Sequence, residues 1–157
     1  MVLALSTGMR KSEILHIKWP DVDLEKGTLI LYKTKNNEIR RVALRGLALE
    51  LFRQHGKVRR LDTDFVFPSE ISSKTGEPFD STKAWEDARR RAKIEDFVFH
   101  DLRHSCASYL AMGGASLLEI AEVLGHKTLE MVKRYSHLAE SHTAGVVEKM
   151  NQRIFGG

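Results

Sequence analysis

Two arginines, a lysine, three histidines and a tyrosine in this chain together carry the functional groups that metal-free attack on a phosphodiester needs. An arginine fork can hold the oxygens of a charged phosphorane, and a cationic side chain can protonate the leaving oxygen. A tyrosine hydroxyl can act as the nucleophile. The residues concerned are Arg10, Lys35, His100, Arg103, His104, His126 and Tyr135.

The segment from His100 to Met112 has the pattern of a helix with a chemically active face. At about 100° per residue, His100, Arg103 and His104 fall within an arc of about 100°. One face therefore offers two imidazoles and a guanidinium, and the neighbouring face anchors the helix in the core. The residues of that apolar stripe are Leu102, Cys106, Tyr109 and Leu110.

The same segment also suggests a zinc hydrolase. His100 and His104 stand at positions i and i+4, and the run is close to the His-Glu-x-x-His pattern of metalloproteases. However, the acid between the histidines is the shorter Asp101, and Arg103 would place a fixed cation beside the metal. The sequence therefore favours phosphate chemistry without a bound metal.

Arg10 follows a turn that contains Gly8 and stands at the expected start of a helix. Backbone N–H groups at such a position can point at the same anion as the side chain. For Arg10 taken alone, an exposed arginine at a helix end is the simpler interpretation. Glu13, one turn later, either orients the Arg10 guanidinium or is only a favourable acid in the first helical turn.

His126 follows a helix-ending glycine, and Tyr135 comes nine residues later. Tyr135 shares a helical face with Met131 and Val132, which is typical of a core tyrosine with its hydroxyl at the edge. Its polar and basic flanks favour a hydroxyl that faces solvent or DNA. A tyrosine with a pKa of about 10 needs a base or nearby cations to act as a nucleophile.

The order and spacing of these residues resemble the tyrosine recombinase (phage integrase) family. The resemblance extends from Ser6–Glu13 to Arg134–Leu138 and so covers essentially the whole chain. It implies that Arg10 and Arg103 clamp the nonbridging phosphate oxygens. It also implies that Tyr135 forms a 3′-phosphotyrosyl bond.

The resemblance assigns roles to the remaining residues as well. His100 would assist proton transfer with the nucleophile, and His126 would donate a further hydrogen bond to the phosphate. Lys35, which alone would be taken for a solubilising turn lysine, would protonate the departing 5′ oxygen from a β-hairpin. His104 and Glu13 would support these groups without touching the substrate.

The implied function is site-specific DNA recombination, without metal or other cofactor. A topoisomerase with the same covalent chemistry and a non-catalytic DNA-binding module are the alternatives. The implied partners are double-stranded DNA and, on DNA, three further copies of the chain in a homotetramer. We expect residues 1–157 to be one catalytic domain, and we expect the separate DNA-clamping domain that family members carry ahead of it to be absent here.

Composition agrees with a globular intracellular protein. At 157 residues with 42% hydrophobic content, the chain is long enough for one packed domain. A single cysteine, Cys106, excludes an internal disulfide and fits a reducing compartment. We find no apolar run long enough to span a membrane and no secretory signal, so we expect a cytoplasmic protein.

The chain has a formal net charge of +4, and many of its basic residues gather in three clusters. Such clusters are typical of a surface that binds a nucleic-acid backbone, although solvated surface charge would explain any one of them. Their members are Lys33, Lys35, Arg40, Arg41 and Arg45; Lys57, Arg59 and Arg60; and Arg89, Arg90, Arg91 and Lys93.

The hydrophobic pattern predicts a mainly α fold with one small three-stranded antiparallel sheet. The expected strands are 21–24, 28–32 and 39–44. The expected helices are 11–19, stopped by Pro20, and 47–56, 81–93, 100–112, 116–124, 129–135 and 143–154.

The last helix has a narrow apolar stripe of Val147, Met150 and Ile154, too small to keep an isolated helix folded. It must dock either on its own domain or, as is common in the resembling family, on a neighbouring protomer. We expect the free chain to be mainly monomeric.

Overall fold

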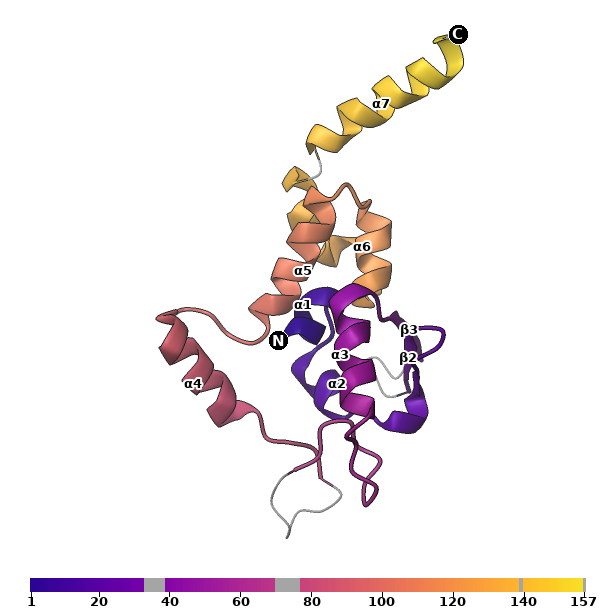
Figure 1. Cartoon of the computed structure of the whole chain (residues 1–157). Coiled ribbons are helices and arrows are strands. Elements are labelled where there is room, and N and C mark those ends of the chain that lie inside the picture. Colours follow the sequence, from indigo (N-terminus) through magenta and orange to yellow (C-terminus); the bar gives the residue numbers. More distant parts are fainter. Residues whose placement is uncertain (33–38, 70–76, 139, 157) are drawn as a thin grey trace. The chain divides into compact units, whose positions relative to one another are not determined.

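The computed structural model describes residues 1–32, 39–69, 77–138 and 140–156 (Figure 1). Two compact units make up the chain, Met1–Arg103 and His104–Gly157. The boundary between them falls inside one helix, α5, which runs from Asp101 to Met112.

The first unit combines short helices with the predicted sheet. Strands β1 (Val22–Asp23), β2 (Thr28–Leu31) and β3 (Arg40–Ala43) pair antiparallel in the order β1-β2-β3. The sheet is therefore confirmed, and each strand is one or two residues shorter than expected. The helices of the unit are α1 (Val2–Thr7), α2 (Lys11–Leu15), η1 (Trp19–Asp21), α3 (Gly46–Gly56) and α4 (Thr82–Ala92).

One face of the sheet provides much of the core of the first unit. Leu29 and Val42 are register partners in β2 and β3, and both are buried. Leu31 and Leu44 lie two residues after Leu29 and Val42. Because side chains alternate along an extended chain, they point to the same side and are also buried. Phe52 of α3 packs edge-on against Trp19 and completes this cluster from the helical side.

Helix α2 is shorter than the predicted helix 11–19, and Pro20 does not end it. The backbone after α2 turns away to pair with a distant segment: Trp19 N–H donates to the Asp64 carbonyl at 2.8 Å, and Val66 N–H donates to the Ile17 carbonyl at 2.9 Å. These long-range hydrogen bonds compete with the local helical pattern and override it. Pro20 instead lies in the first turn of the short 3₁₀ helix η1, where its missing N–H costs nothing.

The second unit consists of α6 (Leu117–Leu124), η3 (Leu129–Met131), η4 (Lys133–Leu138) and α7 (Glu140–Phe155), together with most of α5. Ser116 caps α6: its hydroxyl accepts from the Glu119 N–H, and the Glu119 carboxylate accepts from the Ser116 N–H at 2.7 Å. The predicted helix 129–135 is wrong. The structure has two 3₁₀ turns there, on either side of the buried Val132.

The apolar stripe of α5 also differs from the prediction. Leu102 and Cys106 are buried as expected, but Tyr109 is 65% exposed and Ala107 is fully buried. Tyr109 lies about 200° around the helix from Ala107, so the two cannot share a face. The small side chains of Ala107 and Ala111 form the packing face instead.

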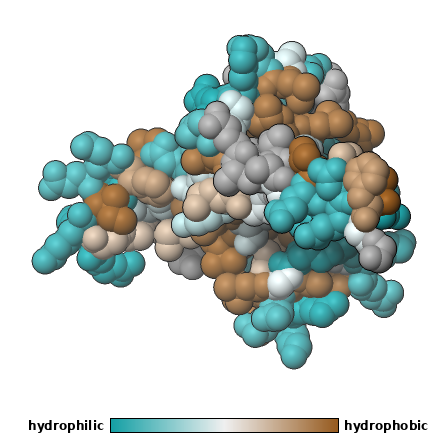
Figure 2. Space-filling model, turned by 90° about the horizontal axis from the view of Figure 1, so that it is seen from above, coloured by the Kyte–Doolittle hydropathy of each residue, from teal (hydrophilic) through white to brown (hydrophobic). Residues whose placement is uncertain are grey.

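Apolar side chains are also found on the surface. Figure 2 shows them interspersed with hydrophilic ones on the face that it presents. The apolar stripe of α7 is also exposed, since Val147, Met150 and Ile154 each have about half or more of their surface accessible. In the described part of the chain, we find no helix that is long and apolar enough to cross a membrane.

Gly27 lies in the turn between β1 and β2, and substitution there would show how closely this turn packs against its neighbours. It has a φ of +60°, and a Cβ there would lie 2.6 Å from Arg45 Nη1 and 2.8 Å from the Leu44 carbonyl oxygen. We expect Gly27→Ala to lower the free energy of unfolding by roughly 2–3 kcal/mol, because left-handed strain and a clash with backbone add together. Urea unfolding would measure this loss.

Gly46 is the matched control. Its φ is +52°, but a Cβ there would meet nothing within 4 Å. Gly46→Ala should therefore cost only the conformational strain, roughly 1 kcal/mol. Equal losses for the two substitutions would show that the contact between Arg45 and the turn is not tight.

Candidate active site

Arg10 is held by the acid one turn further along. It is the N-cap residue of α2, and its backbone N–H donates to Glu13 Oε2 at 2.8 Å. Its guanidinium Nη1 donates to Glu13 Oε1, also at 2.8 Å. The Arg10 side chain is 24% exposed and that of Glu13 only 4%. Glu13 therefore orients the guanidinium, as well as capping the first turn of the helix.

A second guanidinium shares the same carboxylate. Arg40, the first residue of β3, donates from Nη2 to Glu13 Oε2 at 3.1 Å, and its side chain is 11% exposed. Burial lowers the pKa of Arg40, and the charge of Arg10 lowers it further, while Glu13 acts in the opposite direction. The interpretation of Arg40 as part of a surface cluster is wrong. The overlooked signal was strand alternation, which places Arg40 on the same face as Val42.

Arg103 is the most deeply buried arginine among the described residues, with 3% of its surface exposed. Its Nη1 donates to the carbonyl oxygen of Gly8 at 2.5 Å. Gly8 has a φ of +62° and ends α1 in a left-handed cap. This bond joins the first turn of α5 to the turn that carries Arg10, so both predicted clamp residues belong to the first unit. His100 is exposed in the turn just before α5.

Tyr135 is buried in the core of the second unit, with 6% of its surface exposed. Its hydroxyl lies 2.6 Å from Nδ1 of His104. The expectation of a hydroxyl that faces solvent is therefore wrong, and the alternative of a core tyrosine holds. The burial follows from the 3₁₀ turns, since the Tyr135 N–H bonds to the carbonyl of the buried Val132 and the ring then packs beside it.

His126 has a fixed backbone position. Gly125 ends α6 with a φ of +66°, and the His126 N–H reaches back to the Ala121 carbonyl at 2.8 Å. This pair of features is a Schellman motif, which holds the residue after the glycine in one place. The ring of His126 is partly buried.

Comparison with known proteins identifies the family. The family model described as "Phage integrase family" matches residues 1–142. The chain belongs to the phage integrase family. The integrase of Salmonella phage P22 is 34% identical to it over 98% of this chain, and the shufflon-specific DNA recombinase of Escherichia coli is 37% identical over 87%. The chain spans 42% and 33% of the lengths of these two relatives.

Solved structures confirm the fold class. The catalytic domain of bacteriophage HP1 integrase aligns with a TM-score of 0.69 at 29% identity, covering 98% of this chain and 81% of that one. The crystal structure of XerA recombinase aligns with a TM-score of 0.70 at 24% identity, covering 97% of this chain and 56% of that one. The mainly α fold with its small antiparallel sheet is therefore that of a tyrosine recombinase catalytic domain.

Not every predicted site residue of this phage integrase family member can be placed. Lys35 lies outside the described residues. In the first unit Arg10 bonds to Glu13, and Arg103 bonds to Gly8, two residues before Arg10 in the chain. In the second unit His104 bonds to Tyr135. In the described ranges we find no group of three or more His, Cys, Asp or Glu residues arranged to hold a metal ion.

Each predicted basic cluster contains an arginine with a structural partner. Arg45 Nη1 donates to the backbone carbonyl of Gly27 at 2.6 Å. Arg60 pairs with Asp62 and bonds to the Ser69 carbonyl, and Arg89 bonds to the Glu95 carbonyl at 2.6 Å. Part of the positive charge that suggested a nucleic-acid surface therefore holds turns and loops in place.

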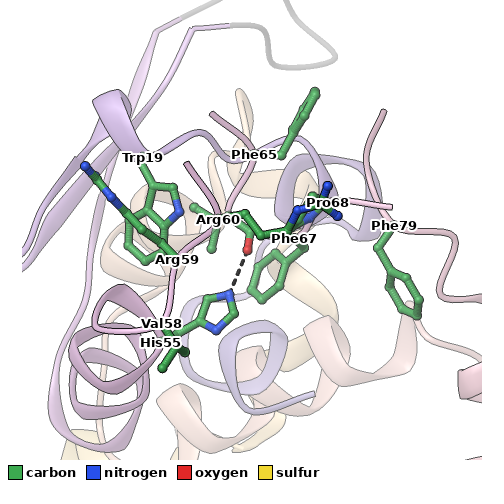
Figure 3. Close-up of a pocket in the computed structure, with 10 residues that line it drawn as sticks. Trp19, His55, Val58, Arg59, Arg60, Phe65, Phe67, Pro68 and Phe79 are labelled. Carbon is green, nitrogen blue, oxygen red and sulfur yellow. Dashed lines mark hydrogen bonds between the residues drawn. The ribbon is translucent and has the colours of Figure 1, made fainter. Parts of the chain in front are cut away.

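Two of the hollows in the described part of the first unit concern residues discussed above. The larger, of about 790 Å³, is lined by Arg10 and Glu13 together with His16, Lys18 and Tyr32. The smaller, of about 360 Å³, lies among aromatic rings beside Trp19, His55 and Phe67 (Figure 3). There His55 Nε2 donates to the Val66 carbonyl at 2.7 Å and its ring stacks on Phe67, so this histidine holds the segment that follows α3.

The Tyr135–His104 hydrogen bond should be measurable as a coupling free energy. We expect Tyr135→Phe and His104→Phe each to destabilise the protein, and the double variant to cost about 1 kcal/mol less than the sum, since one hydrogen bond cannot be lost twice. Urea unfolding of the four proteins of the cycle provides the measurement. Strictly additive losses would mean that the bond does not form in solution.

Proposed function

We propose that this chain is the catalytic domain of a site-specific DNA recombinase that cleaves and rejoins DNA through a 3′-phosphotyrosyl intermediate. The observation that carries the proposal is the Tyr135 hydroxyl, held 2.6 Å from a histidine in a chain of the phage integrase family. Any buried tyrosine hydroxyl needs a hydrogen-bond partner. A histidine is a partner that can also accept the proton, which a tyrosine must lose in order to react.

In the proposed reaction, the Tyr135 oxygen attacks the scissile phosphorus and the bond from phosphorus to the 5′ oxygen breaks. The tyrosine proton passes to a histidine, and Lys35 gives a proton to the departing 5′ oxygen. His100 has the histidine role in the resemblance, whereas the contact at Tyr135 is made by His104. Attack by the 5′-hydroxyl of a partner strand then reforms a phosphodiester and releases the tyrosine. No bond energy is lost, so no nucleotide cofactor is needed.

Arg10 and Arg103 would stabilise the charge that develops on the nonbridging oxygens. Guanidinium groups suit this task because two parallel N–H donors match two phosphate oxygens. The supporting geometry is the preorganisation of both side chains, Arg10 by Glu13 and Arg103 by the Gly8 carbonyl. Donors that are already in place cost little reorganisation at the moment of reaction. His126 would add a further hydrogen bond.

The proposed partners are double-stranded DNA and further copies of the chain. XerH site-specific recombinase, solved with its palindromic difH substrate in a post-cleavage complex, aligns with a TM-score of 0.70 at 26% identity and covers 92% of this chain. That likeness and the basic charge balance support DNA as the substrate. Assembly as a tetramer on DNA, from a free chain that is mainly monomeric, belongs to the same proposal.

The nucleophile can be tested directly. Tyr135→Phe removes one hydroxyl and no charge, so DNA binding should persist while the covalent adduct with a nicked suicide DNA substrate disappears. A denaturing gel reports the adduct, and a binding assay on intact DNA reports the rest.

Tyr109→Phe is the control, because Tyr109 lies on the exposed face of α5 and should form the adduct at the parent rate. An adduct from the Tyr135 variant that survives heat and detergent would refute the assignment. Binding without any adduct from the parent protein would favour the non-catalytic module. Relaxation of supercoils without strand exchange between paired sites would favour the topoisomerase.

The clamp makes a separate prediction. Arg10→Lys retains the charge but loses the two-pronged contact with phosphate. We expect single-turnover cleavage to slow by about 10²-fold or more, the scale of losing one transition-state donor. An unchanged cleavage rate would remove Arg10 from the site.

A further inference from the structure

The carboxylate of Glu13 is shared between two arginines in an unequal way. Oε1 accepts from the Arg10 guanidinium, through Nη1. Oε2 accepts from the Arg10 backbone N–H at 2.8 Å and from Arg40 Nη2 at 3.1 Å. Among the hydrogen bonds between described residues, the Arg10 guanidinium therefore reaches this carboxylate through a single nitrogen.

This arrangement prevents an arginine–carboxylate pair from closing on itself. An isolated arginine and glutamate prefer two parallel N–H···O bonds. In that geometry Glu13 would occupy the edge of the guanidinium that a phosphate needs, and it would cancel the charge of Arg10. With Arg40 bound to Oε2, that oxygen is already occupied and the negative charge is divided between two cations. The three groups together carry a net charge of +1, which one phosphodiester neutralises.

We propose that Arg40 is a positioning residue that reserves Arg10 for phosphate by holding the competing carboxylate of Glu13. The inference rests on the proposed function, since it concerns the same clamp. Arg40 acts through Glu13: Arg10 and Glu13 are part of the described lining of the 790 Å³ groove, and Arg40 is not. Its position at the start of β3, opposite Leu31 of β2, makes its backbone part of the sheet. The sheet thus fixes the backbone position from which the Arg40 side chain holds the Glu13 carboxylate.

The key variant is Arg40→Met, which keeps an unbranched apolar stem, shorter than the arginine side chain, and removes the charge. Arg10 and Glu13 remain as a neutral pair, so no buried charge is left without a partner. We expect single-turnover cleavage of suicide DNA, at saturating DNA, to slow by about 10-fold to 10²-fold. This is the scale of the effect when a supporting residue is lost or a catalytic group is displaced. Arg40→Lys should lose less, because an ammonium can still hold Oε2. Arg53→Met, at an exposed arginine that donates to the Leu24 carbonyl, should cleave at the parent rate.

The decisive readout is the effect of Glu13→Gln in two backgrounds. In the parent protein, Glu13→Gln removes the group that orients Arg10 and should slow cleavage. In the Arg40→Met protein, the same change removes the competitor for Arg10 and should restore part of the lost rate. A merely structural role for Arg40 cannot produce this reversal of sign. Thermal unfolding of every variant shows whether the fold is retained.

The outcomes separate this inference from the proposed function. A parent protein that forms no covalent adduct refutes the proposed function, and this inference with it. A parent that cleaves, with an Arg40→Met protein that cleaves equally fast, refutes the role of Arg40 alone. A slower Arg40→Met protein in which Glu13→Gln slows cleavage by the same factor as in the parent also refutes it, because the two residues then act independently.

Discussion

A guanidinium can leave water only when its charge and its N–H donors have partners, and this constraint organises the first unit of the chain. Arg103 is buried against the carbonyl of Gly8, and Arg40 is buried against Glu13. Each partner adjoins Arg10 in the chain or in space, so the interactions that satisfy the buried arginines also fix the turn before α2. The fold and the position of Arg10, a residue of the proposed phosphate clamp, are therefore stabilised by the same contacts.

The position of a backbone polar group is fixed more precisely than that of a polar group at the end of a flexible side chain. Gly8 offers its carbonyl from a left-handed cap, and the Arg10 N–H reaches Glu13 from the N-cap position of α2. Neither group can move without breaking a helix end. Arg45 and Arg89 are held in a similar way elsewhere, since the guanidinium of each donates to a backbone carbonyl. In this chain, several arginines therefore have a structural role as donors to backbone carbonyls.

Local sequence rules predicted the features that depend on nearest neighbours. The three strands and the extent of α6, from its beginning at Ser116 to its stop at Gly125, follow from alternation and turn chemistry. The spacing of Arg10 and Glu13 suggested a contact between their side chains, and the structure contains it.

Features that depend on distant partners were missed. The end of α2 is set by pairing with residues 64–66, which no local pattern contains. Tyr135 was expected near solvent because its neighbours in the chain are polar, yet 3₁₀ geometry turns the ring inward. Arg40 was grouped with its charged neighbours, although its alternation with Val42 indicated burial. Lys35 has a role only through the family, since a turn lysine has no signal of its own.

The two cores of the molecule differ in kind. The core of the first unit contains Met9, Leu29, Leu44 and Phe52, whereas that of the second depends on Ala107, Ala111 and Ala121 beside a few larger side chains. Less apolar surface per residue means a smaller free energy of local opening. Amide protons of α6 should therefore exchange with deuterated solvent faster than those of β2. Tyr135, the proposed nucleophile, thus belongs to the unit that we expect to open more readily, and Arg10 and Arg103 belong to the unit that we expect to stay closed.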